Sequence, residues 1–366
     1  MCIANLGVSL NVIKILLAPF TALYWMVTTL RNFLYDQRVF KSVHFTPFVV
    51  CVGNLRVGGT GKSPMIEYLV RLLQADHPIA ILSRGYGRKT KGTRIATAQD
   101  TSQTLGDEPY QFYRKFNKTN TDKVVVAVGE ERIVAVPEIL YHHPETEVIL
   151  LDDAFQHRAI VADLNILLTE YARPFFRDTV LPGGRLRESK KGAARAHVVI
   201  VSKCPADISE QQMFSIEKNI RKYIRSDTPV FFTGIHYLPP QSVWNGQIAS
   251  LQKVLLVSGI GNTHPLEQYV QEHFKLLFHV SYPDHHQYTE KDIQYIRKAY
   301  NRLADASVCI LTTEKDKVRL MPLAEQHWKD MPLYDLPIET FFLKSQSAFE
   351  QLVKERAKAD ILLHKN

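Results

Sequence analysis

The stretch that decides the fold spans residues 49–64 and reads Val49-Val50-Cys51-Val52-Gly53-Asn54-Leu55-Arg56-Val57-Gly58-Gly59-Thr60-Gly61-Lys62-Ser63-Pro64. Its apolar start predicts a buried strand, and its glycines let backbone N–H groups turn toward phosphate oxygens just before a helix begins. The stretch therefore predicts a nucleotide phosphate site, in which Lys62 supplies positive charge and Ser63 a hydroxyl for Mg²⁺. The residues expected to contact the phosphates are Gly58, Gly59, Thr60, Gly61, Lys62 and Ser63.

One departure separates this loop from the usual phosphate-binding pattern. The pattern G-x-x-x-x-G-K-[ST] has a glycine five residues before Gly61, and Arg56 stands there instead. The loop is thus a variant in which Gly58 and Gly59 make the turn. A glycine turn without a ligand is the alternative, but the preceding strand and the following helical pattern favour phosphate binding.

The composition is that of a globular protein with anionic partners. With 366 residues and 45% hydrophobic content, the chain is expected to form two domains. Its formal net charge of +8 favours phosphates, acidic lipid headgroups or nucleic acid as partners. The 4 cysteines include no C-x-x-C pair, which argues against a disulfide framework or a cysteine zinc site and fits a reducing compartment.

Residues 3–34 predict a membrane-associated helix. Apolar side chains recur on one helix face at alternating spacings of four and three, namely Leu6, Leu10, Ile13, Leu17, Phe20, Tyr24 and Val27. Only a narrow polar stripe remains, formed by Asn11, Lys14, Ala18, Thr21, Thr28 and Asn32. A spanning helix needs about 20 predominantly apolar residues. The strictly apolar part is shorter and contains Pro19, so we expect a helix that lies in or dips into one leaflet. Burial in the protein core is the alternative.

From Phe48 onward, strand-like and helical runs alternate, which predicts a mostly parallel sheet with helices on both faces, as in P-loop NTPases. After the strand before the loop, strands are expected at residues 79–82, 124–128, 148–151, 165–168 and 197–201. In such a sheet, ligands bind beyond the carboxyl ends of the strands.

The chain is expected to divide into four parts. Residues 1–35 form the membrane-associated helix and residues 36–228 the P-loop core. Residues 229–250 form a hairpin-like linker with short strands at 229–237 and 242–250, because Asn245-Gly246 is a hairpin signal. Residues 251–366 form a smaller α/β domain with strands at 254–257, 276–280 and 308–311 and a helix at 348–363.

Two pairs of carboxylates are candidates for the chemistry. Asp152 and Asp153 end an apolar strand, where either acid can reach a magnesium ion held by Ser63. Asp107, in Gly106-Asp107-Glu108-Pro109, is interpreted either as the N-cap of a helix or as a general base for an acceptor hydroxyl.

His285 and His286 resemble metal ligands at first, but no further His or Cys stands at zinc-ligand spacing, which makes a zinc site improbable. One interpretation is that these histidines lie in a surface turn. The other is that the second domain places a histidine over the active site. Pro205 stands where a GTPase has the guanine-reading aspartate, so ATP is preferred over GTP.

Two basic loops lie at the predicted ligand edge of the sheet. One carries Arg84, Arg88 and Lys89, and the other Arg185, Arg187, Lys190 and Lys191. They are solvated faces, contacts to ATP or lipid headgroups, or contacts to an anionic, phosphate-bearing acceptor, for which Arg84 and Arg187 are the candidates. No interleaved aromatics accompany them, which disfavours nucleic acid as a partner.

These motifs together resemble the tetraacyldisaccharide 4'-kinases of lipid A synthesis. The segments that carry the resemblance are Gly53-Asn54, Gly58-Gly59-Thr60-Gly61-Lys62-Ser63-Pro64, Ser83-Arg84-Gly85-Tyr86, Gly106-Asp107-Glu108-Pro109, Asp152-Asp153-Ala154-Phe155-Gln156-His157, Leu181-Pro182-Gly183-Gly184-Arg185-Leu186-Arg187-Glu188, Asp284-His285-His286 and Thr313-Glu314-Lys315-Asp316. Ala154, where the family usually has glycine, and Arg185, in a variable slot, are small departures.

The resemblance implies a lipid kinase. It would transfer the γ-phosphate of ATP, with Mg²⁺, to the 4'-hydroxyl of a tetraacyldisaccharide 1-phosphate, a lipid A precursor, at the cytoplasmic face of the inner membrane of a Gram-negative bacterium. Asp107 matches the family's catalytic base and His285 its hydrogen-bonded partner. Lys62 matches the family's residue that contacts the phosphates, and Arg187 and Glu188 match a pair of residues on the substrate side. Because Asp107 and His285 lie on opposite sides of the predicted junction, catalysis is expected to require domain closure.

A P-loop switch or assembly ATPase is the main rival interpretation. Such a protein would share the phosphate loop and the metal-binding acids, but it needs no base placed for a sugar hydroxyl.

Overall fold

The computed structural model describes residues 10–117, 124–303, 305 and 307–365. Their contacts separate two compact units. Unit 1 comprises the described parts of residues 1–84, 131–235 and 340–366, and unit 2 those of residues 85–130 and 236–339. Neither unit is continuous in sequence, because the chain leaves unit 1 twice and returns to it twice. The predicted four-part division of the chain stays a prediction.

A mostly parallel sheet forms the centre of unit 1, as the alternation of strands and helices predicts. The part of this sheet that belongs to unit 1 has the strand order β14-β8-β7-β6-β1-β5-β2. The strands are β1 (Phe48–Asn54), β2 (Ile79–Ser83), β5 (Val148–Asp152), β6 (Leu164–Glu170), β7 (Val198–Ser202), β8 (Val230–Tyr237) and β14 (Ile338–Phe342). Parallel ladders join β1 to β5 and β6. All 7 residues of β1 are buried, because apolar neighbours and helices cover both of its faces.

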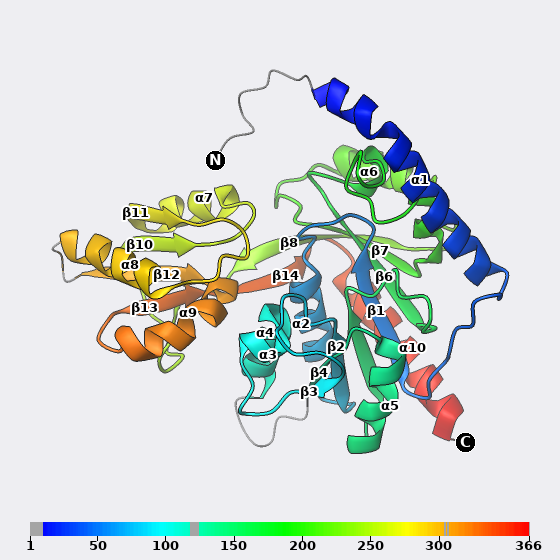
Figure 1. Cartoon of the computed structure of the whole chain (residues 1–366), viewed down its shortest axis with the longest axis horizontal. Coiled ribbons are helices and arrows are strands. Elements are labelled where there is room, and N and C mark those ends of the chain that lie inside the picture. The colour runs from blue at the N-terminus through cyan, green and yellow to red at the C-terminus, as the bar shows by residue number, and fades with distance from the viewer. Residues whose placement is uncertain (1–9, 118–123, 304, 306, 366) are drawn as a thin grey trace. The chain divides into compact units, whose positions relative to one another are not determined.

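Helices cover this sheet (Figure 1). They are α1 (Leu10–Asp36), α2 (Lys62–Leu73), α5 (Arg132–His142), α6 (Glu210–Ile220) and α10 (Gln346–Lys365), with short 3₁₀ turns η1 (Phe175–Arg177) and η2 (Lys190–Arg195). Helix α2 begins directly after Gly61, and Pro64 is accommodated in its first turn, where a missing N–H costs no hydrogen bond. Met65, Ile66 and Leu69 bury its inner face.

Helix α1 is a long outer helix of unit 1 (Figure 1). Leu16, Phe20, Leu23 and Met26 on its apolar face are exposed, so the core-helix alternative is wrong. Among the described residues, no helix is long and apolar enough to cross a membrane. The expected start of this helix at residue 3 lies outside the described residues.

Unit 2 contains a five-stranded sheet with the strand order β11-β10-β12-β13-β9. Its strands are β9 (Gln241–Ser242), β10 (Lys253–Ser258), β11 (Lys275–Ser281), β12 (Val308–Thr313) and β13 (Leu333–Leu336). Helices α7 (His264–His273), α8 (Glu290–Arg302) and α9 (Glu314–His327) accompany them. The core on one side is built around the fully buried Trp328.

The expected strand at residues 242–250 is wrong for most of its length. Strand β9 has only 2 residues and pairs with β13. The chain then turns at Gly246, whose φ is +72° and whose N–H donates to Ser242 O at 2.8 Å. The Asn-Gly signal thus marks a real turn, which ends the strand instead of joining two long ones.

Residues 85–130 complete unit 2. They form β3 (Arg94–Ile95), α3 (Ser102–Leu105), α4 (Asp107–Phe116) and β4 (Val124–Val128), with β3 antiparallel to β4. Ion pairs join α4 to α9: Lys115 lies 2.8 Å from Glu314, and Lys315 lies 3.0 Å from Glu108. The loop that begins α4 is therefore held by the C-terminal half of the chain.

Candidate active site

The phosphate loop lies at the carboxyl end of β1 and is held from two sides. Asn54 Nδ2 donates to Thr60 Oγ1 at 2.8 Å, and Ser202 Oγ donates to Thr60 O at 2.8 Å. The ammonium of Lys203, at the end of β7, donates to Gly59 O. These bonds fix the backbone of the loop before any ligand binds. Rigid placement of N–H groups is what phosphate recognition requires.

Two positions of this loop have a backbone conformation that favours glycine. Gly58 and Gly61 have φ of +123° and +81°, a region that other residues rarely adopt. Arg56 is not among the described residues with positive φ. Its Nε donates to Asp178 Oδ2 at 2.8 Å, so the side chain is paired away from the turn. The position of the usual first glycine therefore tolerates arginine.

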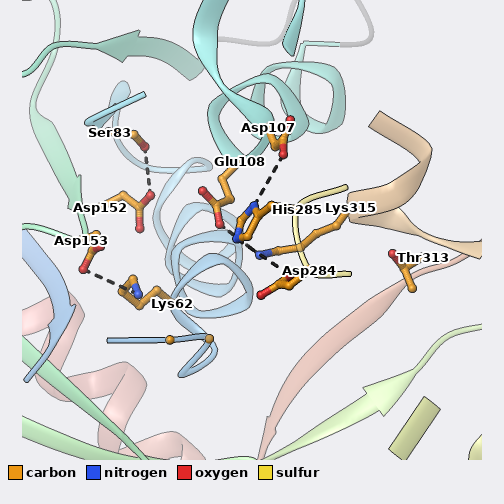
Figure 2. Close-up of polar contacts among 12 residues, drawn as sticks. Lys62, Ser83, Asp107, Glu108, Asp152, Asp153, Asp284, His285, Thr313 and Lys315 are labelled. Carbon is orange, nitrogen blue, oxygen red and sulfur yellow. Dashed lines mark hydrogen bonds and ion pairs between the residues drawn. The ribbon is translucent and has the colours of Figure 1, made fainter. Parts of the chain in front are cut away.

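Asp153 lies between two cations at the end of β5. Arg187 donates to it from both terminal nitrogens, at 2.7 and 2.9 Å, and Lys62 Nζ lies 3.6 Å from Oδ1 (Figure 2). Burial raises the pKa of this carboxyl, but Lys62 and Arg187 outweigh burial, and the net pKa is lowered. Asp153 is thus held ionised, and it orients Lys62 beside the phosphate loop.

Asp152 has a different environment. It is buried, and Ser83 Oγ donates to its Oδ2 at 3.1 Å (Figure 2). Arg132 Nη2 donates to its backbone oxygen at 3.4 Å. The oxygens of Ser63, Asp152 and Asp153 suit a hard divalent cation such as Mg²⁺. Asp153 already contacts two cations, Arg187 and Lys62.

Glu188 is buried in a hydrogen-bond network inside unit 1. Its Oε2 accepts from Asn32 Nδ2 at 2.6 Å, and its Oε1 accepts from Gln156 Nε2 at 2.9 Å and Arg195 Nη2 at 2.7 Å. The carboxylate thus joins α1 to the loop after β5. Its expected role as a substrate contact stays a prediction.

Helix α1 also holds the loop at residues 181–188, which the sequence did not reveal. Tyr24 Oη donates to Arg187 O at 2.8 Å, and Thr21 Oγ1 accepts from Gly183 N at 2.9 Å. Thr21 and Asn32 belong to the predicted polar stripe, which indicated a polar side of the helix but not the loop that it contacts. Tyr24 was grouped with the apolar face. The helix therefore supports the residue that pairs with Asp153.

Asp107 is the first residue of α4, and the N-cap position is occupied by Gly106. The N-cap interpretation of Asp107 is therefore wrong. Instead, Arg319 Nε donates to Asp107 Oδ2 at 2.6 Å, and His285 Nδ1 lies 3.8 Å from the same oxygen (Figure 2). Burial raises the pKa of this carboxyl, the charge and the hydrogen bond of Arg319 lower it, and the net pKa is lowered.

Asp107 and His285 both belong to unit 2. The two residues therefore do not lie on opposite sides of a domain junction, because residues 85–130 fold with residues 236–339. The expectation that catalysis requires domain closure stays a prediction. His286 is committed elsewhere: it stacks on Tyr282 with ring centroids 4.4 Å apart, and its Nε2 lies 3.1 Å from Asp292 Oδ2. Only His285 stands beside Asp107.

The basic loops contain residues of two kinds. Arg88 pairs with Glu130 at 2.7 Å, Lys89 donates to Gln103 at 3.0 Å, and Lys190 donates to Phe176 O at 2.8 Å. These contacts join the basic loops to neighbouring segments of the chain. Arg84 is exposed at the end of β2, and its expected contact with the acceptor stays a prediction.

Comparisons with known proteins agree with one another. A family model described as tetraacyldisaccharide-1-P 4'-kinase matches residues 13–358. The tetraacyldisaccharide 4'-kinase of Cytophaga hutchinsonii is 40% identical over 351 residues, which cover 94% of this chain and 96% of that protein. The tetraacyldisaccharide 4'-kinase of Parabacteroides distasonis is 39% identical over 366 residues, which cover 95% and 96%.

A solved structure gives the same result. The apo form of LpxK from Aquifex aeolicus, in complex with ATP, is 27% identical with a TM-score of 0.73, and the match covers 94% of this chain and 99% of that one. Sequence and fold are therefore similar over nearly the whole of each chain.

Proposed function

The chain belongs to the tetraacyldisaccharide-1-P 4'-kinase family, the kinases of lipid A synthesis, and from this premise we propose how its residues perform the reaction. In this proposal the γ-phosphate of ATP passes to the 4'-hydroxyl of a tetraacylated disaccharide 1-phosphate. The same phosphorus bonds to the acceptor oxygen and loses the oxygen of ADP, and the hydroxyl proton passes to a base.

ATP is assigned to unit 1. Backbone N–H groups of residues 58–63 cradle the phosphates, and Lys62, oriented by Asp153, supplies charge to them. Ser63 and Asp152 would hold Mg²⁺, with Asp153 beside them; a magnesium ion there neutralises charge on the transferring phosphoryl group. The solved relative that contains ATP supports this assignment.

Asp107 is assigned as the general base. A base needs an ionised carboxylate in a fixed orientation, and the lowered pKa of Asp107 and its bond to Arg319 supply both. His285 is the partner residue. The cations Arg84 and Arg187 are assigned to the phosphate-bearing acceptor, which requires positive charge at the sheet edge.

The acceptor is a lipid, and α1 is assigned to the membrane surface. Its exposed apolar face suits the boundary between headgroups and acyl chains. We place the enzyme at the cytoplasmic face of the inner membrane, where ATP and the lipid A precursor are both accessible.

The observation that carries the proposal is the oriented, ionised Asp107 with His285 beside it, since a P-loop switch ATPase needs no such pair for a sugar hydroxyl. Incubation with γ-labelled ATP, Mg²⁺ and the tetraacyldisaccharide 1-phosphate tests it. We expect label in the lipid, in a lipid-dependent reaction. Label that appears only as free phosphate would establish the ATPase instead.

A further inference from the structure

We propose that Arg319 is a positioning residue for phosphoryl transfer, whose guanidinium bridges the Asp107 carboxylate and the His285 imidazole and fixes the orientation of both. The inference rests on the proposed role of Asp107 as the base. All the groups concerned belong to unit 2.

The guanidinium uses each of its three nitrogens on a different part of unit 2. Nε donates to Asp107 Oδ2 at 2.6 Å, at the start of α4. Nη2 lies 3.3 Å from His285 Nδ1, in the loop after β11. Nη1 donates to Gly259 O at 3.1 Å, just after β10, and to Asp316 Oδ1 at 3.3 Å. With a side chain only 1% exposed, Arg319 occupies the centre of this cluster.

Arg319 is what connects the two proposed reactive residues. The 3.8 Å between His285 Nδ1 and Asp107 Oδ2 is too long for a hydrogen bond. Arg319 contacts both of these atoms. Its Nε donates to Asp107 Oδ2, and its Nη2 lies beside His285 Nδ1. Among the described residues, Arg319 and His285 thus both lie at Oδ2 of Asp107, and the acceptor hydroxyl is assigned to Oδ1.

The contact with Arg319 also selects the tautomer of His285. Arginine remains protonated in proteins and is only a donor, so Nδ1 of the imidazole must accept from Nη2. A neutral imidazole that accepts at Nδ1 carries its proton at Nε2. That nitrogen lies 3.8 Å from Asp284 Oδ1, on the exposed side of the loop. His285 therefore presents an N–H donor away from Arg319.

A second carboxylate holds Arg319 in place. Asp316 is fully buried one helical turn earlier on α9. Its Oδ1 accepts from Tyr288 Oη at 3.1 Å, and its Oδ2 accepts from Gly259 N at 3.0 Å and Thr313 Oγ1 at 2.7 Å. Asp316 thus balances the buried charge of Arg319, and its own bonds fix the direction of the guanidinium.

Lysine cannot replace Arg319 in this role. A guanidinium is a planar fork whose nitrogens reach Asp107, His285 and Gly259 at once, whereas an ammonium is a single point charge on a flexible stem. A loss of orientation of about 1 Å at a reacting group can lower turnover about 10²-fold. The conservative substitution therefore separates orientation from charge.

The first experiment compares Arg319→Lys with Arg297→Lys in the full chain, assayed with ATP, Mg²⁺ and the lipid acceptor. Arg297 is a matched control on α8, because it is an exposed arginine that pairs with Asp330 and donates to His327 O. We expect kcat of Arg319→Lys to fall about 10²-fold while KM for ATP changes less than about twofold. Arg297→Lys should match the unchanged chain. Equal kcat in all three proteins overturns the proposal.

The pH profile distinguishes positioning from a merely structural role. The charged and titratable groups that face Asp107 are Arg319 and His285, with Asp316 and Asp284 behind them. In Arg319→Gln, loss of the cation should raise the pKa of Asp107, so the acid limb of kcat/KM moves to higher pH by about one unit or more. An acid limb that does not move overturns the assignment.

A measurement on the unsubstituted protein covers the case in which the variants do not fold. With ¹⁵N-labelled histidine, and His285→Asn to assign the signal, NMR at neutral pH should show His285 protonated at Nε2 and accepting at Nδ1. The opposite tautomer contradicts the bridge. Asp107→Ala separates the two hypotheses: full activity there refutes the proposed base, whereas an inactive Asp107→Ala with a normal Arg319→Lys refutes only the inference about Arg319.

Discussion

The two carboxylates at the centre of the proposal, Asp107 and Asp153, share a physical design although they lie in different units. Each is half-buried or more, which by itself favours the neutral acid, and each is contacted by at least one arginine that favours the ionised form. The cations differ in consequence. Arg187 and Lys62 make Asp153 a structural anchor for a phosphate-binding lysine, whereas Arg319 leaves Asp107 at the N-terminus of α4, where a hydroxyl can reach it.

Removal of the Asp107 carboxylate tests the base assignment directly. Asp107→Ala should lower kcat by about 10² or more, because general base catalysis is lost, while ATP binding stays nearly unchanged. Turnover with the lipid acceptor and ATP affinity by calorimetry measure the two effects. Asp330→Asn, which changes an exposed acid that pairs with Arg297, is the control. Wild-type turnover in Asp107→Ala would refute the assignment.

Asp153 should contribute to stability in a pH-dependent way. Its pKa is lowered in the folded protein, so its contribution is present above the unfolded value of about 3.9 and is lost as pH falls through the folded value. Urea unfolding of the unsubstituted protein and of Asp153→Asn should therefore differ at pH 7 and converge toward pH 3. A difference that stays constant over this range contradicts the ion pairing with Lys62 and Arg187.

The sequence predicted these site residues unequally. Gly58 to Ser63 form a contiguous motif, and Asp152 and Asp153 follow an apolar strand, so local pattern was enough. Arg319 has no such signal: it is one arginine on a helix, and its partner Asp107 lies 212 positions away. Only the packing of α4 against α9 brings them together, and packing of this kind cannot be read from periodicity.

At the scale of elements, α1 has two faces with separate roles. The exposed apolar face is assigned to lipid, and Thr21, Tyr24 and Arg31 bond to the loops at residues 154–158 and 181–188. The sequence predicted the faces but not the docking, because hydrophobic periodicity identifies a polar side without naming its partner. Removal of residues 1–34 is expected to release the protein from membranes, but it also removes these bonds.

Point substitutions separate the two faces of α1. Tyr24→Phe removes the hydroxyl that donates to Arg187 O. Loss of one hydrogen bond, worth about 1 kcal/mol, should lower kcat/KM for the lipid about fivefold. Vesicle binding should not change. Leu23→Gln with Met26→Gln, both on the exposed face, should weaken vesicle binding and spare turnover of detergent-solubilised lipid. Vesicle flotation and turnover give the two readouts. A Tyr24→Phe protein that loses vesicle binding contradicts this division.

At the scale of the whole molecule, the order of the sequence does not match the order of folding units. Most strand positions were predicted within about two residues, because each depends on a local apolar run. The assignment of residues 85–130 to unit 2, and of residues 340–366 to unit 1, depends on contacts between distant segments. Nothing in local composition marks either crossing.

The return of the chain to unit 1 makes its last helix part of the proposed ATP-binding unit. Phe349 on α10 is fully buried, and its ring centroid lies 4.7 Å from that of Phe342, 5.4 Å from Phe231 and 6.1 Å from Tyr68 on α2. Because α2 follows the phosphate loop directly, α10 supports the helix that begins at Lys62. A protein that ends before residue 340 would lack this support.

Phe349→Ala tests whether α10 and the ATP site unfold together. The cavity left by a buried phenylalanine costs about 3–5 kcal/mol, and Leu363→Ala, on the same helix but exposed, should cost less than about 0.5 kcal/mol. Ligands stabilise only the unit that binds them. In urea unfolding, Phe349→Ala should therefore lower the midpoint of the transition that ATP raises. If that transition is unchanged and an ATP-insensitive one falls instead, α10 does not belong to the ATP-binding unit in solution.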